Sequence, residues 1–168
     1  SKRGPIRAKA IVQYSLSLVL FVVVSFVLTP GAAYPSDQVI QDNLYGVSFA
    51  TAQDGWMVGA FGTVYRTSNG GQSWSAQDSG TTDHLYDVDF VDAEYGWIVG
   101  RSGKVLHTAD RGKTWTKQTS STDKHLFSVD FVDRQFGCAV GDWGAVVVTR
   151  DGGNTWQALP LPDDIILN

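Results

Sequence analysis

Hydrophobic and polar residues alternate in three segments of the chain that lie 41 residues apart. In the second segment, Tyr86, Val88 and Phe90 would lie on one face of the backbone, and aspartates would lie on the other. A period of two residues is typical of a β-strand. The sequence therefore predicts a strand in each segment. The three segments are residues 44–49, 85–90 and 126–131.

Two further strands are expected after each of these segments. A Gly-Trp-x-Val-Gly motif occupies residues 55–59 and 96–100, and residues 137–141 keep its glycines with Cys138 in place of the tryptophan. Short runs of apolar, β-branched residues bounded by glycine are typical of buried strands. The third strands are expected around residues 64–65, 105–106 and 146–147.

An eight-residue box follows each third strand: Thr, then Asp or Asn two residues later, Gly two after that, and Ser or Thr followed by Trp. Asp and Asn side chains hydrogen-bond the backbone two residues ahead, and Gly accepts the positive φ that a tight turn requires. We therefore interpret the box as a structural turn between two antiparallel strands, with its tryptophan over the hairpin and opening the fourth strand. Its defining residues are Thr67, Asn69, Gly71, Trp74, Thr108, Asp110, Gly112, Trp115, Thr149, Asp151, Gly153 and Trp156.

The box threonines lie at positions 67, 108 and 149, so the period is 41 residues. Four short antiparallel strands in a repeat of this length are typical of one β-propeller blade. We predict an all-β fold of Asp-box propeller blades. The blades are expected at residues 44–84, 85–125 and 126–166, with a fourth starting at residue 167.

The match of Leu167 to the start of a fourth blade raises the question of closure. Propellers usually close with about 4–8 blades, and an open array leaves unpaired strand edges. We expect the natural protein to continue past Asn168. The alternative is a short protein whose open edges are covered by a partner.

The N-terminal part has a different character. Residues 11–28 are almost entirely apolar and would rise about 27 Å as a helix, close to the ~30 Å of a bilayer core. A signal peptide cleaved near Gly31-Ala32-Ala33 would show a similar pattern. We take a retained transmembrane helix as the expectation, followed by a linker over residues 29–43.

The charges indicate an orientation. Residues 1–10 contain four basic residues and no acid, so this basic N-terminus is expected in the cytoplasm. The repeats would then lie on the periplasmic or thylakoid-lumenal side. Of 13 Lys and Arg, nine remain after residue 10, against all 17 Asp and Glu, giving a net charge of −8. So acidic a domain is a poor partner for nucleic acid.

Positions that differ between repeats are candidates for function. The loop between the second and third strands has glycines on both sides in every repeat, but its two inner residues vary. Aromatic residues and arginine are enriched at protein interfaces, whereas packing on a neighbouring blade is the structural alternative. We predict a partner-binding role for these loop residues. The candidates are Phe61, Arg101, Asp142 and Trp143.

The sequence predicts no catalytic residue, metal or cofactor. One carboxylate per box is too few for calcium, which takes about 6–8 oxygen ligands. His84 and His125 occupy equivalent positions, which favours a structural role, and His107 stands alone near a strand end. Cys138 is expected to be a buried, inert thiol. The acids that recur in register favour a solvated rim, namely Asp89, Asp92, Asp130 and Asp133.

The combination of Leu-x-x-Val-x-Phe, Gly-Trp-x-Val-Gly and the Thr-x-Asp-x-Gly-x-Thr-Trp box resembles the photosystem II stability/assembly factor family. Members are Asp-box β-propellers with repeats related to the bacterial neuraminidase repeat. The resemblance covers residues 44–168. It implies non-catalytic binding to membrane protein subunits, especially of photosynthetic reaction centres, from the lumenal or periplasmic face. The chain departs from the family at Cys138 and in its acidic exported part, where the family has an arginine-rich patch.

From the residues and the resemblance together, we expect a membrane-anchored accessory or assembly subunit that stabilises an integral membrane complex, such as a photosynthetic reaction centre or its antenna. A general periplasmic scaffold unconnected with photosynthesis is one alternative. A sialidase-like glycoside hydrolase is another, but the exported arginines show no recognisable catalytic arrangement. These arginines are Arg66, Arg101, Arg111, Arg134 and Arg150.

Overall fold

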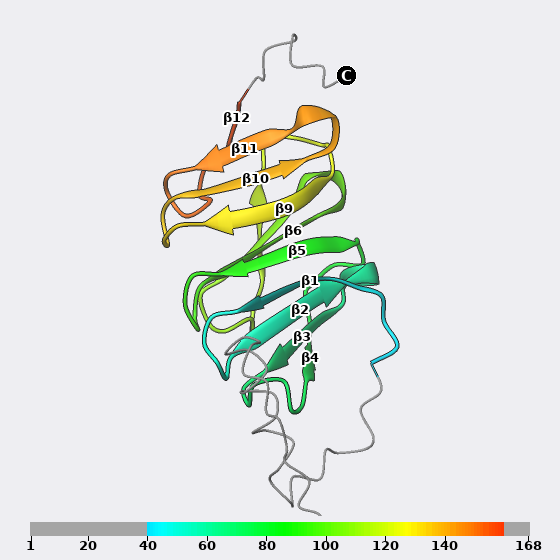
Figure 1. The fold of residues 1–168 in the computed structure, drawn as a ribbon. Coiled ribbons are helices and arrows are strands. Elements are labelled where there is room, and N and C mark those ends of the chain that lie inside the picture. The colour runs from blue at the N-terminus through cyan, green and yellow to red at the C-terminus, as the bar shows by residue number, and fades with distance from the viewer. Residues whose placement is uncertain (1–39, 160–168) are drawn as a thin grey trace, which may run out of the picture. The chain divides into compact units, whose positions relative to one another are not determined.

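The computed structural model describes residues 40–159, and this part of the chain consists of three four-stranded antiparallel sheets (Figure 1). Strands that follow each other in sequence lie next to each other in each sheet, which confirms the predicted all-β blades. The first blade contains β1 (Leu44–Phe49), β2 (Gly55–Gly59), β3 (Val64–Thr67) and β4 (Ser75–Gln77). The second contains β5 (Leu85–Phe90), β6 (Gly96–Gly100), β7 (Lys104–Thr108) and β8 (Thr116–Thr119). The third contains β9 (Leu126–Phe131), β10 (Gly137–Gly141), β11 (Val146–Thr149) and β12 (Gln157–Ala158).

Several expectations concern other parts of the chain. The basic N-terminus at 1–10, the transmembrane helix at 11–28, most of the linker at 29–43 and the start of a fourth blade at 167 lie outside the described residues. Residues 40–159 contain no helix with the length and apolar character needed to cross a membrane.

Consecutive blades are joined by a buried aromatic stack. Trp56 of β2 lies flat against Phe90 of β5, with ring centroids 3.5 Å apart. Trp97 of β6 lies in the same way against Phe131 of β9, at 3.6 Å. Both indoles are fully buried, and each indole N–H donates to a box carbonyl of the next blade over 3.2 Å. The Gly-Trp-x-Val-Gly motif thus supplies both the packing and the polar contact between two blades.

The first strand of each blade contains a bulge that the alternation of residues did not predict. In β5 the pairing with β6 shifts between Leu85 and Asp87. A bulge adds one residue to one strand and re-aims the side chains on either side of it. As a result Leu85, rather than Tyr86, enters the core with Val88, while Tyr86 remains partly exposed.

Aspartates of the first strands also join the blades. Asp87 accepts a hydrogen bond from the Val129 backbone N–H over 3.0 Å, and Asp89 accepts one from the Phe131 N–H over 2.8 Å. Burial raises the pKa of the Asp89 carboxyl. The prediction of a solvated rim was therefore wrong for Asp89, because adjacent blades approach closely enough to exclude much of the water around it.

The Asp box forms the turn that the sequence predicted. In the second blade, the Asp110 carboxylate accepts hydrogen bonds from the Thr114 N–H (2.9 Å), the Thr114 hydroxyl (2.7 Å) and the Thr108 hydroxyl (2.8 Å). The Thr108 hydroxyl in turn accepts from the Gly112 N–H over 2.9 Å. A Cβ placed on Gly112 would lie 3.1 Å from the Trp115 ring, so the tryptophan covers the turn as expected.

The two ends of the described array have open faces. Val47 of the first blade is 59% exposed, although its equivalents Val88 and Val129 are buried against the preceding blade. Val140 on the last face is also exposed, whereas its equivalent Val99 is fully buried. Residues 40–159 contain no blade that covers either face. The expectation of further blades past Asn168 concerns residues outside this range and stays a prediction.

The aromatic stack is open to a direct test by Trp97→Cys, which introduces the residue found at the equivalent position 138. We expect a loss of about 3–5 kcal/mol in the free energy of unfolding, because the variant removes the ring from Phe131 and a buried donor from a carbonyl. Urea unfolding of the full chain in detergent measures it. Cys138→Ala is the control and should cost far less, since Cys138 stacks on no described ring. Equal losses would contradict the assigned role.

The box carboxylate is tested by comparing Asp110→Ala with Asp110→Asn, the residue that nature uses at position 69. We expect Asp110→Ala to lower the free energy of unfolding by about 1 kcal/mol, and Asp110→Asn to lower it less. The Thr114 N–H, helped by the Thr114 and Thr108 hydroxyls, lowers the folded-state pKa of Asp110. The advantage over Ala should therefore be complete above about pH 5 and be lost as pH falls through that lowered pKa. Thermal unfolding between pH 3 and 7 checks both points.

Candidate docking surface

Three short 3-10 turns lie along one edge of the blades, each between a second and a third strand. They are η1 (Ala60–Gly62), η2 (Arg101–Gly103) and η3 (Asp142–Gly144). The four predicted partner-binding residues all belong to these turns. The structure therefore brings Phe61, Arg101, Asp142 and Trp143 to the same edge, which we call the turn edge.

The central residue of each turn adopts a left-handed backbone conformation. The φ angles are +55° for Phe61, +53° for Ser102 and +52° for Trp143. This region is unfavourable for a bulky residue and costs on the order of 1–3 kcal/mol. Ser102 shows that the turn forms without a large ring. The aromatic side chains at the other two positions are thus not required by the turn itself.

The rings on these turns are strongly exposed. Phe61 is 74% exposed and Trp143 is 85% exposed. Phe61 lies at the junction of two described blades, and its ring already has a neighbour in His84, with centroids 5.0 Å apart. Its exposure therefore does not result from a missing blade. The structural alternative, in which this ring packs on the neighbouring blade, explains little of its surface.

His84 and His125 fasten the turns to the next blade. The ring Nδ1 of His84 accepts from the Phe61 N–H over 3.4 Å, and that of His125 accepts from the Ser102 N–H over 3.0 Å. Their carbonyls accept from the following turn, at Arg101 and Asp142, over 2.9 Å each. The expected repeat-structural role of these histidines is confirmed.

The same histidines belong to a series of aromatic rings that sequence reasoning missed. Tyr45, Tyr86 and Phe127 occupy the bulge positions of the first strands. Tyr86 lies 5.9 Å from Tyr45 and 5.3 Å from Phe127, between ring centroids. The bulge turns these side chains away from the core, and Tyr45 and Phe127 are about half exposed. This ring series could be predicted only with knowledge of the bulge, and the alternation of residues does not indicate the bulge.

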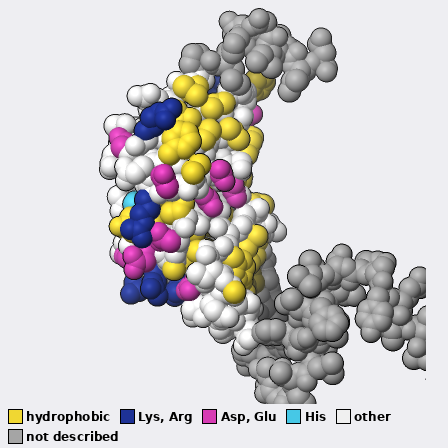
Figure 2. All heavy atoms as spheres, turned by 60° about the vertical axis from the view of Figure 1, so that its left-hand side comes forward, with side chains coloured by type: hydrophobic (Ala, Val, Ile, Leu, Met, Phe, Trp, Pro, Cys, Tyr) yellow, Lys and Arg dark blue, Asp and Glu magenta, His cyan; other side chains and the backbone are white. Residues whose placement is uncertain are grey.

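Charges accompany the rings but do not form a basic patch. Lys104 pairs with Asp83 over 2.8 Å, and the Lys124 ammonium donates to the Trp143 carbonyl over 3.1 Å. On the face drawn in Figure 2, acidic and basic side chains are interspersed, and apolar side chains gather in its upper part. This mixed distribution agrees with the expectation that the chain lacks the arginine-rich patch of the family on this face.

The remaining candidates have structural surroundings. Cys138 is half-buried rather than fully buried, and burial raises its thiol pKa, which makes it a weak nucleophile. His107 lies within β7 against Trp97, with ring centroids 4.9 Å apart. In residues 40–159, no three His, Cys, Asp or Glu side chains are placed to hold a metal ion.

Arginines of the repeats are engaged in separate places. Arg66 pairs with Asp54 over 2.7 Å, and Arg134 pairs with Asp92 over 2.8 Å. The Arg150 guanidinium lies 5.0 Å from the centroid of a phenylalanine ring. Arg66 belongs to the first blade and Arg134 and Arg150 belong to the third, and each is engaged with a partner of its own rather than with the other two.

Together, the blades and boxes define a protein built from Asp-box β-propeller repeats. Residues 35–123 match the sequence model of the family described as Photosynthesis system II assembly factor YCF48. The chain belongs to this family. No curated protein matches the sequence significantly.

Solved structures support the same assignment. The chain is similar to a structure described as YCF48 bound to D1 peptide, at 27% identity and a TM-score of 0.63, over 70% of this chain and 40% of that one. YCF48 from Cyanidioschyzon merolae gives 24% identity and a TM-score of 0.64, over 72% and 41%. The chain thus spans about two fifths of the length of these relatives.

An enzyme shares the fold at greater distance. An ancestral GH74 enzyme matches with 18% identity and a TM-score of 0.58, over 70% of this chain and 18% of the enzyme. A likeness at that identity concerns the fold alone. The family that matches the sequence is described as an assembly factor, not as an enzyme.

Because Phe61 adopts a left-handed backbone conformation, we predict that replacing its ring stabilises the fold, even if the ring is needed for docking at the turn edge. Phe61→Asn should raise the free energy of unfolding by about 0.5–1 kcal/mol, because asparagine tolerates this backbone region better than a bulky ring. Thermal unfolding of the full chain measures the change. The reverse substitution in the matched turn, Ser102→Phe, should lower stability. If Phe61→Asn instead cost more than 1 kcal/mol, the ring would be a folding element.

Proposed function

We propose that this protein is a non-catalytic accessory or assembly subunit that docks on an integral membrane complex, namely a photosynthetic reaction centre, from the periplasmic or lumenal side. Membership of the YCF48 family supports the class of function. A similar structure described as bound to D1 peptide supports a polypeptide as the partner.

We assign the docking to the turn edge. The observation that carries this assignment is the exposure of Phe61 and Trp143 on strained backbone, at positions where Ser102 suffices for the turn. Exposed aromatic residues with nearby arginine are typical of interface hot spots. Phe61 and Trp143 would supply apolar contact, and Arg101 and Asp142 would supply charged contacts of opposite sign that fix the orientation of the partner.

The proposed anchor complements this edge. The Ala60 N–H donates to the Asn43 carbonyl over 2.8 Å, so the chain enters the first blade beside the first 3-10 turn. If residues 11–28 span the membrane, the tether reaches the blades at the docking edge. A tether raises the effective concentration of the blades near membrane partners, so modest contacts suffice for docking.

The decisive experiment is purification of the tagged full chain from its native membrane in mild detergent, followed by mass spectrometry and an absorption spectrum. We expect stoichiometric reaction-centre subunits with bound pigment. A colourless eluate containing other membrane proteins would contradict the photosynthetic assignment and favour a general scaffold.

The docking edge is tested in the same preparation. The double variant Phe61→Ser/Trp143→Ser should reduce the co-purified partner at least tenfold, since each hot-spot ring contributes a large part of the binding energy. Ser102→Ala, in the equivalent turn of the second blade, is the matched control and should leave recovery unchanged. Full recovery of the partner with the double variant would contradict the assignment of docking to the turn edge, but it would not contradict the proposed function.

A further inference from the structure

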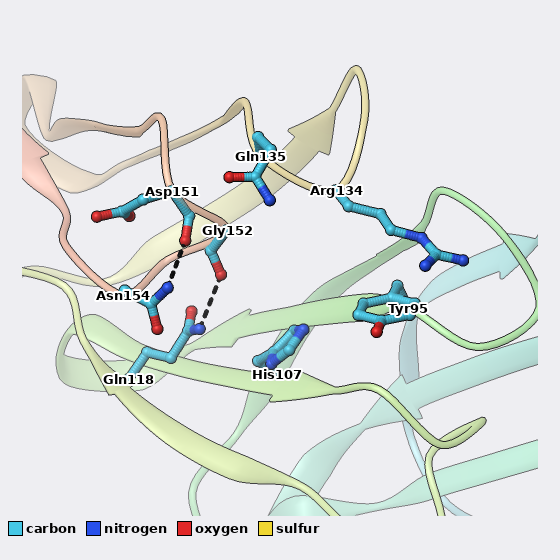
Figure 3. A pocket seen from close by; sticks show the side chains of 8 residues that line it. All are labelled: Tyr95, His107, Gln118, Arg134, Gln135, Asp151, Gly152 and Asn154. Carbon is cyan, nitrogen blue, oxygen red and sulfur yellow. Dashed lines mark hydrogen bonds between the residues drawn. The ribbon is translucent and has the colours of Figure 1, made fainter.

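A cavity of about 340 Å³ opens between the second and third blades, on the edge opposite the 3-10 turns (Figure 3). The edges are opposite because the 3-10 turns precede each third strand and the Asp boxes follow it. Tyr95 and His107 from the second blade line the cavity on one side. Arg134, Gln135 and Asn154 from the third blade line it on the other.

The junction of the first and second blades provides an internal comparison, because equivalent residues lie 41 positions earlier. There, Arg66 occupies the position of His107 and forms a 2.7 Å ion pair with Asp54, which occupies the position of Tyr95. The Arg66 guanidinium also lies 5.6 Å from the Trp56 ring centroid. At the first junction the long Arg66 side chain thus reaches a partner, whereas the second junction has a shorter imidazole at this position.

The same comparison shows that the cavity holds fewer formal charges, although Arg134 adds one where the first junction has Ala93. Four positions that are charged at the first junction are occupied by uncharged or weakly basic groups at the second. The pairs are Asp54 and Tyr95, Arg66 and His107, Glu94 and Gln135, and Lys113 and Asn154. Burial lowers the pKa of His107, so its ring is neutral at neutral pH.

The two charged residues that line the cavity, Arg134 and Asp151, both have partners. Arg134 is paired with Asp92 over 2.8 Å, and its guanidinium lies 3.9 Å from the centroid of the Tyr95 ring. The Asp151 carboxylate accepts hydrogen bonds from the Thr155 N–H and hydroxyl within its own box. A charged ligand would therefore lose its hydration without gaining an unpaired opposite charge, which is costly.

The polar groups of the cavity differ in how they are held. The Gln118 amide is fixed, since it donates to the Gly152 carbonyl over 3.0 Å and accepts from the Trp156 indole over 3.2 Å. In Figure 3, the Gln135 amide and the His107 ring point toward the space between them. These two side chains offer both donors and acceptors to a ligand.

We propose that this cavity binds an uncharged carboxamide side chain, Asn or Gln, together with the backbone on either side of it, from a polypeptide partner. A carboxamide carries a donor and an acceptor in one plane and can satisfy Gln135 and His107 at once. The volume suits a segment of about two residues, at the lower end of ligand pockets in general. The site lies on the opposite edge from the proposed docking surface and does not depend on it.

The test uses the full chain in nanodiscs and N-acetylglutamine methylamide as the probe, with saturation-transfer NMR to measure affinity. We expect a Kd of about 1 mM, typical of a fragment of this size. The corresponding glutamate and lysine derivatives should bind at least tenfold more weakly. Equal binding of all three would overturn the proposal, as would no detectable binding of the glutamine probe at 20 mM.

The position of binding is checked by labelling the three histidines. The His107 ring signal should shift with the probe, whereas His84 and His125, which lie on the turn edge, should not. A shift confined to His84 or His125 would place the binding elsewhere and contradict the proposal.

The chain itself supplies the matched variant. Tyr95→Asp/His107→Arg installs at the second junction the ion pair that the fold already accommodates at Asp54 and Arg66. It should still fold, although it removes the Tyr95 ring from Arg134, and it should weaken binding of the probe at least tenfold because it places an ion pair where the probe needs uncharged groups. Gln135→Ala, a smaller change, should weaken the probe without any effect on folding. Unchanged affinity in a folded variant would refute the assignment.

Discussion

Adjacent blades depend on one repeated contact, in which a buried tryptophan stacks on a phenylalanine of the following blade and donates its indole N–H to that blade's box. The contact has an apolar part, the ring stack, and a polar part, the indole hydrogen bond, and one position of the tryptophan must satisfy both. The box must therefore hold its carbonyl at a fixed place, which explains why the carboxylate of Asp110 is saturated with local hydrogen bonds. The Asp box thus serves the junction between blades as much as the hairpin that contains it.

Once the junction is fixed in this way, the loops around it are free to vary. Position 61 and its equivalents hold Phe, Ser or Trp in the same left-handed backbone. The hydrogen bonds of the first two turns come from the main chain and from a histidine of the next blade, so they do not depend on the side chain at this position. Position 66 and its equivalent hold Arg or His beside the same kind of tryptophan. Variation at such positions changes the surface without disturbing the stack.

The sequence predicted the blades well because both of its signals are local. Period-two alternation identifies strands, and the box identifies a turn, without reference to distant residues. The bulge at Tyr86 could not be predicted in this way, since a bulge shifts the alternation only through pairing with another strand. The burial of Asp89 is similarly non-local, because its partner is the Phe131 N–H, 42 residues away. The loop residues Phe61 and Trp143 were identified because they differ between repeats, whereas the ring series of Tyr45, Tyr86 and Phe127 was missed because it depends on the bulge.

Comparison between repeats also separates two kinds of departure from the common frame. A substitution such as Trp to Cys138 removes a stacking ring and puts a small, half-buried thiol in its place. The coordinated replacement of Asp54 by Tyr95 and of Arg66 by His107 removes both members of an ion pair, so no unpaired charge remains buried. Losing one partner of such a pair would be costly, whereas losing both is tolerated. The junction can therefore open a cavity with few formal charges while the Trp97 stack that holds the two blades together is preserved.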